Sequence, residues 1–215
     1  MRHLLFLFSQ VAAGIRGLLF VVRWCIVTYK MVSIANQSCI CKEVRMNWTR
    51  TLLDGLAMAA YFNLFAAAVA LYNPRLLFPC YPPAIIKAAK EPPTGAENRF
   101  YWLWICFGEL LPLLFYGAVS AVESGTTGFW SLGLTGYVQW MMVNFCDLFF
   151  LDFWLIQKKA KERFIIPGTE GHPGYGFKAW MKGYALPEHL LQWPFLMCPI
   201  LAAAQAGLGL LLQTL

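Results

Sequence analysis

The chain has 215 residues, of which 59% are hydrophobic and only 13% are charged, and its mean hydropathy is +0.55. Soluble domains carry about a quarter charged residues, so this composition excludes an ordinary soluble domain and predicts an integral membrane protein. The net charge of +6 lies almost entirely in residues 1–45, which hold six Lys and Arg against one Glu. Such a distribution is typical of membrane-flanking charge and indicates no nucleic-acid partner.

Four apolar segments are long enough to cross a bilayer as helices, since one crossing takes about 20 residues. They span residues 52–72, 101–122, 129–156 and 190–212. Their continuous apolar runs lack the two-residue alternation of an outer-membrane barrel. We therefore expect an all-α, polytopic transmembrane helical bundle that forms a single membrane domain from residue 46 to 215. A fifth, weaker segment at 4–22 is interrupted by Gln10 and Arg16.

The distribution of Lys and Arg between the segments predicts how the bundle is oriented. The connections 73–100 and 157–189 hold four and six Lys and Arg, whereas the turn 123–128 holds none. Under the positive-inside rule, both long connections lie in the cytoplasm and the short turn lies outside. We expect a plasma membrane of the bacterial type.

The first 45 residues conflict with this orientation. If the segment 4–22 spans the membrane, residues 23–51 lie outside with five Lys and Arg, against the positive-inside rule. Three interpretations remain: a signal-like N-terminal segment, a genuine fifth span, or a native start at Met46. We favour the start at Met46, which makes residues 1–45 a doubtful N-terminal extension.

The seven cysteines predict neither a disulfide framework nor a metal centre. They are odd in number and scattered. Cys39 and Cys41 are too close for the usual zinc spacings, and no second Cys or His pair accompanies them. The sequence indicates no particular cofactor.

Polar residues inside the predicted helices are the first candidates for a functional site. Asn63, Glu109 and Asp147 lie in three different helices at similar depth, and Asn144 shares the face of Asp147. Because no Lys or Arg lies inside the four spans, two acids that meet there would share a proton or bind a cation. The alternative is that these residues only hold the helices together. A second set, Asp54, Gln139 and Gln205, lies nearer the other end of the helices.

Asp152 follows Asp147 by five residues, which places the two on different faces of an α-helix. We therefore expect Asp152 to pair with Lys158, Lys159 or a lipid-facing water. The basic run Lys158, Lys159, Lys161 and Arg163 predicts contact with anionic lipid.

The connection 157–189 contains a second candidate site in a Gly/Pro-rich loop. Four glycines and two prolines between residues 166 and 176 predict a shaped turn. Glu170 and His172 in this turn are candidates for a catalytic acid/base pair. The alternative is that both residues are ordinary solvated loop residues.

The run His172-Pro173-Gly174-Tyr175 resembles the H-P-x-Y element of membrane methyltransferases that act on isoprenylcysteine or phospholipid head groups. The resemblance implies a cytoplasmic site for S-adenosylmethionine and a lipid-like substrate. It covers four residues. Gly171 stands where that family has an Arg, and the family's pair of Glu residues beyond the last helices has no counterpart here.

Two functions follow from these observations. The first is a small transport protein or membrane-complex subunit with a buried carboxylate site, acting as a homo-oligomer or with a partner membrane subunit because the chain is short for a complete carrier. The second is a membrane enzyme with a cytoplasmic-face site for a lipid-like substrate.

The start at Met46 is tested by the mass of the mature protein. We expect intact-mass spectrometry of protein purified from its native membrane to give a chain that begins at Met46. A mass that includes residues 1–45 would contradict this expectation.

Overall fold

The computed structural model describes residues 46–215, and within this range it is helical and contains no strand. Four helices are long and apolar enough to cross a membrane: Trp48–Tyr72, Gly95–Glu123, Phe129–Lys159 and Phe177–Leu212. This confirms the predicted all-α bundle with four spans. The weak segment 4–22 and the N-terminal extension 1–45 lie outside the described residues.

Three of the four long helices change their winding along the way. The first long helix, α2, Trp48–Tyr72, is the exception and is a regular α-helix throughout. The second joins α4, Gly95–Leu103, to α5, Leu111–Glu123, through the π-helical stretch Trp104–Leu110. The third continues from α6, Phe129–Cys146, into the π-helical stretch Asp147–Lys159. The fourth runs from α7, Phe177–Trp180, through the π-helical stretches Met181–Ala185 and Glu188–Met197 to α8, Cys198–Leu212.

Each long helix contains one of the four predicted segments and extends beyond it. The longest extensions lie at one end of the bundle. The fourth begins at Phe177, whereas the apolar pattern begins only at Leu190. The second begins at Gly95, where Thr94 and Glu97 form a capping box. These extra turns carry polar residues, so hydropathy alone does not find them.

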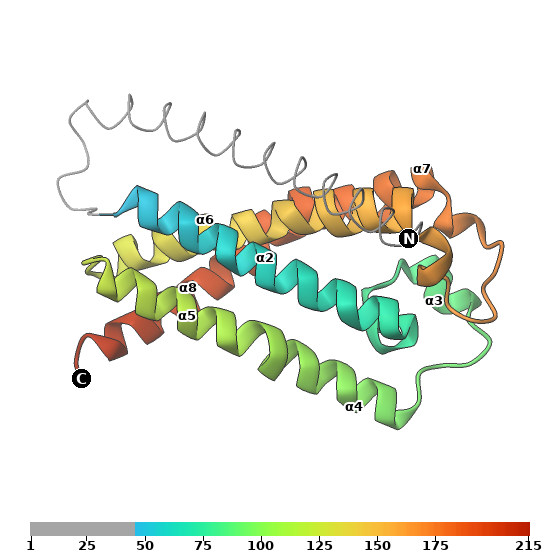
Figure 1. The fold of residues 1–215 in the computed structure, drawn as a ribbon, viewed down its shortest axis with the longest axis horizontal. Coiled ribbons are helices and arrows are strands. Elements are labelled where there is room, and N and C mark those ends of the chain that lie inside the picture. Colours follow the sequence, from blue (N-terminus) through green and yellow to red (C-terminus); the bar gives the residue numbers. More distant parts are fainter. Residues whose placement is uncertain (1–45) are drawn as a thin grey trace, which may run out of the picture.

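The two long connections lie at one end of the bundle, which we call the loop end, and the short turn before α6 lies at the other, the turn end (Figure 1). The first connection holds the 3₁₀-helix Pro74–Cys80 and the short helix α3, Pro83–Ala88. The second holds the 3₁₀ turns Lys161–Phe164 and Pro173–Tyr175. The orientation of these ends across a membrane stays a prediction.

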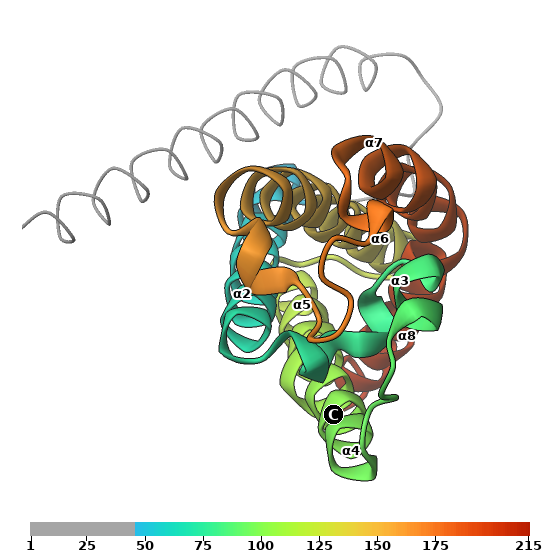
Figure 2. The same cartoon turned by 90° about the vertical axis from the view of Figure 1, so that its right-hand side faces the viewer.

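The helix α6 packs most extensively against α8 and α2, and Figure 2 shows the helices grouped around a common axis. Small residues allow this close approach, as expected for helices in lipid. A Cβ at Gly136 would meet the Cα of Ala202 at 3.2 Å, and one at Gly55 would meet the Cα of Gln139 at 3.2 Å. Many large apolar side chains point outward instead, among them Leu64, Phe107, Phe195, which is the pattern of a lipid-facing surface.

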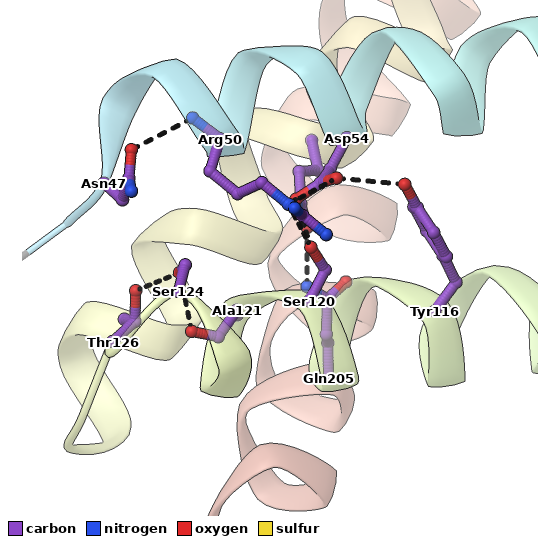
Figure 3. Close-up of polar contacts among 10 residues, drawn as sticks. Asn47, Arg50, Asp54, Tyr116, Ser120, Ala121, Ser124, Thr126 and Gln205 are labelled. Atoms are coloured by element: carbon purple, nitrogen blue, oxygen red, sulfur yellow. Dashed lines mark hydrogen bonds and ion pairs between the residues drawn. The ribbon is translucent and has the colours of Figure 1, made fainter.

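A polar network holds the turn end together (Figure 3). Asp54 on α2 accepts hydrogen bonds from Tyr116 at 2.9 Å and from Ser120, both on α5. Arg50, one turn earlier on α2, pairs with Asp54 at 3.2 Å and supplies the positive charge. The sequence grouped Asp54 with Gln139 and Gln205, and Gln139 packs against Gly55, the residue next to Asp54.

Deeper in the bundle, Gln205 on α8 donates to Gln139 on α6 at 2.7 Å. Trp140 donates to the amide oxygen of Gln205 at 3.1 Å. Beyond them toward the loop end lies an apolar layer that contains Met58, Phe62, Trp140, Val143 and Cys198. This apolar layer lies between the turn-end network and the polar residues near the loop end.

The close contact at Gly136 yields a stability prediction. We expect Gly136→Ala to lower the free energy of unfolding by about 1–3 kcal/mol, because the new methyl group would push against the backbone of α8. The matched control is Gly133→Ala, where the nearest atom to a Cβ is the Ala206 Cβ at 3.9 Å. Thermal unfolding of both variants in detergent measures the difference, and equal stabilities would contradict the packing described here.

Candidate functional site

The loop end of the bundle contains a cavity of about 320 Å³. Its walls come from all four long helices and from both long connections. The lining residues are mostly apolar and aromatic, with one group of ionisable side chains: Asp147, Asp152, Glu188, His189. A mostly apolar cavity with a few convergent polar groups is the usual form of a ligand site, so this cavity is the candidate functional site.

The centre of the ionisable group is the imidazole of His189, which is only 2% exposed. Its Nδ1 lies 2.7 Å from Oδ1 of Asn144, and its Nε2 lies 3.0 Å from Oδ2 of Asp152. The Asn144 amide also donates from Nδ2 to the His189 carbonyl oxygen at 2.9 Å. The third long helix, which carries both Asn144 and Asp152, therefore holds the His189 ring of the fourth helix on both of its nitrogens.

These contacts determine where the protons lie. Because Asn144 uses its NH₂ group to donate to the His189 carbonyl, its Oδ1 must accept, and Nδ1 of His189 carries a hydrogen. On the other side, Nε2 faces a carboxylate oxygen of Asp152. One further proton must therefore lie between His189 and Asp152, as an imidazolium–carboxylate pair or as an imidazole with a carboxylic acid.

A second carboxylate stands beside this pair. Oδ2 of Asp147 lies 3.9 Å from Nε2 of His189, and the Asp147 side chain is 18% exposed. Within residues 46–215, Asp147 accepts no direct hydrogen bond, and it lines the cavity. The site thus has two acids and one imidazole within reach of one another, with Asp147 available to a ligand.

The pairing of Asp152 differs from the prediction. Asp152 was expected to face away from Asp147 and to pair with Lys158 or Lys159, but it is buried and pairs with His189. The reason is the π-helical winding of Asp147–Lys159. Hydrogen bonds from residue i to i+5 place residues five apart on the same face, so Asp147 and Asp152 both reach His189.

Trp180 connects this site to the Gly/Pro-rich loop. Its indole Nε1 donates to Oδ1 of Asp152 at 2.8 Å. Its ring stacks on Tyr175 from the loop, with centroids 6.3 Å apart, and meets Tyr81 edge-on at 5.9 Å. Burial raises the pKa of Tyr81 above its usual range, so the phenol keeps its proton and donates to the Phe164 carbonyl at 2.9 Å.

Two other predicted polar residues, Asn63 and Glu109, make no hydrogen bond to His189 in the described chain. Asn63 is buried but donates to the Ala59 carbonyl of its own helix at 2.8 Å, and its Oδ1 has no partner among the described residues. Glu109 is fully buried, and neither of its carboxyl oxygens has a hydrogen-bond partner within residues 46–215. A bare negative charge there would cost several kcal/mol. Glu109 lies within electrostatic reach of Asp147, but no hydrogen bond joins it to the site.

The loop candidates Glu170 and His172 each bind the backbone of their own turn. Glu170 is exposed and accepts from the Gly168 N–H at 2.9 Å, and this bond holds the pKa of Glu170 below its usual value. The stabilisation of the turn is therefore present above the ordinary pKa and lost as the pH falls through the lowered one. His172 accepts from the Gly174 N–H through Nδ1 at 3.0 Å. No hydrogen bond joins Glu170 to His172 in the described chain.

The predicted lipid-contact run begins in the last turn of the third long helix and continues into the 3₁₀ turn Lys161–Phe164 at the loop end. Lys158, Lys159 and Arg163 are exposed and Lys161 is half-buried. The ammonium of Lys158 lies 5.6 Å from the ring centre of Phe153 and 5.2 Å from that of Phe177. Contact of this run with anionic lipid stays a prediction.

Sequence reasoning missed two residues of the site, His189 and Trp180. Both were assigned to the connection, because the apolar pattern begins only at Leu190. A usable signal was present: an ionisable residue directly before a span lies at the membrane boundary and can turn inward. Among the described residues, no group of three or more His, Cys, Asp or Glu is placed to hold a metal ion.

Comparisons with family models, characterised proteins and solved structures gave no match for this chain. The likeness to membrane methyltransferases therefore rests on four residues alone. In the structure, Tyr175 of that element is buried and accepts a hydrogen bond from the Ile166 N–H at 2.9 Å.

The role of Asn144 in holding His189 can be tested by stability. We expect Asn144→Leu to lower the free energy of unfolding by about 1–3 kcal/mol, because it leaves buried polar groups of His189 without partners. Asp147→Asn, which removes a charge but no direct hydrogen bond, should change stability less. Thermal unfolding in detergent compares the two variants, and a larger loss in Asp147→Asn would contradict the hydrogen bonding described here.

Proposed function

We propose that this protein binds a small ligand in the loop-end cavity and couples that binding to a proton held by Asp147, Asp152 and His189. In this function it serves as a small transport protein or as a ligand-binding subunit of a membrane complex. The observation that carries the proposal is the buried imidazole of His189, held between Asn144 and Asp152 on the cavity wall.

The arrangement suits proton coupling because its charge depends on one shared proton. With that proton between His189 and Asp152 and with Asp147 ionised, the three groups carry one net negative charge. Losing the proton adds a second negative charge in a poorly solvated place, and such a change is costly unless something compensates for it. A ligand that enters the cavity changes the same balance, so ligand and proton binding are linked.

The apolar layer supports a transport protein in a state that is closed toward the turn end. Three residues of this layer, Met58, Trp140 and Val143, are fully buried. They lie between the cavity and the polar network of Arg50 and Asp54. Access to the cavity is then from the loop end, which we place in the cytoplasm of a bacterial-type plasma membrane. Transport requires a second state in which this layer separates.

The number of long helices in the described residues favours assembly with further subunits. The four helices described here are few for a complete alternating-access carrier, which usually combines two structural repeats. We therefore propose a homo-oligomer or a complex with a partner membrane subunit. The surrounding bilayer covers the outward-facing apolar side chains.

The same site supports a second candidate, a membrane enzyme acting at the loop end on a lipid-like substrate. Both ring nitrogens of His189 are already hydrogen-bonded, so the general base of such an enzyme would be the Asp147 carboxylate, which lines the cavity. An alternative version of the enzyme uses Glu170 and His172 in the loop, with S-adenosylmethionine as the methyl donor.

The proton-coupling function predicts an electrical signal. Proteoliposomes adsorbed on a sensor should give a transient current after a pH jump, because protons enter the buried site. We expect the current to fall to background in Asp147→Asn and in His189→Gln. Glu162→Gln, which removes an exposed loop carboxylate, is the matched control and should keep the current.

Two results would decide against this function. Unchanged currents in both site variants, with protein that elutes as a single species, would show that the buried group does not exchange protons. Heat of binding with S-adenosylmethionine in calorimetry, abolished in His172→Asn or Glu170→Gln, would favour the loop-based enzyme instead.

A further inference from the structure

We propose that the ligand of the loop-end cavity is an organic cation, an amine or quaternary ammonium group with a small apolar body. This inference rests on the proposed function, because it assigns a substrate class to the same cavity. The charge, the aromatic rings and the size of the cavity support it.

The charge of the wall favours a cation. Three carboxylates line the cavity, on Asp147, Asp152 and Glu188, and the described residues that line it include His189 but no Lys or Arg. The His189 imidazole is committed to Asp152 at 3.0 Å. The ionisable groups within electrostatic reach of Asp147 in the described chain are His189, Asp152, Glu188 and Glu109, of which only His189 can be positive. One carboxylate, Asp147, is therefore left without a full counter-charge, and a ligand cation would supply it.

Aromatic rings form a large part of the remaining wall. Tyr101, Trp104, Tyr184 and Trp193 all line the cavity. The rings of Tyr101 and Trp104 lie 6.1 Å apart and are tilted, and Trp193 stacks on His189 at 6.4 Å. Electron-rich faces of Trp and Tyr attract ammonium groups, above all quaternary ones, in a desolvated site. Carboxylate and rings together match a cation that carries apolar groups.

Other ligand classes fit this wall less well. A phosphate or carboxylate ligand would meet three acids without a Lys or Arg among the described lining residues, so it would be repelled. A neutral apolar ligand would leave Asp147 desolvated and unpaired, which is costly. The volume of about 320 Å³ lies at the small end of the range for ligand pockets, so a whole phospholipid is excluded.

The test uses phenyltrimethylammonium as the probe, because it combines a quaternary ammonium group with one aromatic ring. Isothermal titration is done on the full chain in nanodiscs of zwitterionic lipid, which lack a surface charge that would attract the probe. Benzenesulfonate is the anionic probe of similar size, and benzyl alcohol is the neutral one. The variants are Asp147→Asn in the cavity and Glu162→Gln on the exposed loop.

We expect saturable binding of phenyltrimethylammonium and no binding of benzenesulfonate. Asp147→Asn should weaken the cation's binding about tenfold or more, since an ionic contact in a desolvated site is lost. Glu162→Gln should leave it unchanged. Both variants are first checked for a single elution peak, so that misfolding is not mistaken for lost binding.

Three results would overturn the inference: equal affinity for the neutral or anionic probe, unchanged cation affinity in Asp147→Asn, or no binding of any probe. The pH-jump currents separate its failure from that of the proposed function. Currents that persist without cation binding leave proton coupling standing and remove only the substrate class. Cation binding without currents removes proton coupling and leaves a cation-binding protein.

Discussion

The structure depends on the rule that a polar group buried in a membrane bundle must find its partner inside the protein. His189 shows the consequence most directly. Its ring, its carbonyl and the facing Asp152 carboxylate are all bound by Asn144, Trp180 or one another. These bonds join the third and fourth long helices at the loop end. The same contacts that satisfy buried groups also orient the ring toward the cavity.

The bundle satisfies its polar groups in two separate places with an apolar layer between them. At the turn end, Arg50 neutralises Asp54, so this network is balanced and has an evident structural role. At the loop end, two carboxylates share one imidazole and Asp147 accepts no direct hydrogen bond within the described chain. An unbalanced polar group beside a cavity is a stronger indication of function than a balanced one.

The Gly/Pro-rich loop acts on the site through its packing. Tyr175 stacks on Trp180, and Trp180 donates to Asp152. The glycines at 168 and 171 have φ values of 85° and 74°, which side chains with a Cβ rarely adopt, and these turns bring Tyr175 back against the bundle. A change in this loop would therefore move the indole that orients Asp152, even though Glu170 and His172 themselves bind only their own turn.

The sequence by itself determined the membrane class, the four helices and the polar positions Asn144 and Asp147, because hydropathy and composition act locally along the chain. It did not reveal His189 or Trp180 as site residues, since both lie in helical turns too polar for the apolar pattern. Only the tertiary structure decided which polar residues meet. The π-helical winding places Asp147 and Asp152 on one face, and the extended fourth helix brings His189 between Asp152 and Asn144. Winding and helix packing arise from contacts between segments that are distant in the chain. An apolar pattern with a period of 3.6 residues does not reveal such contacts.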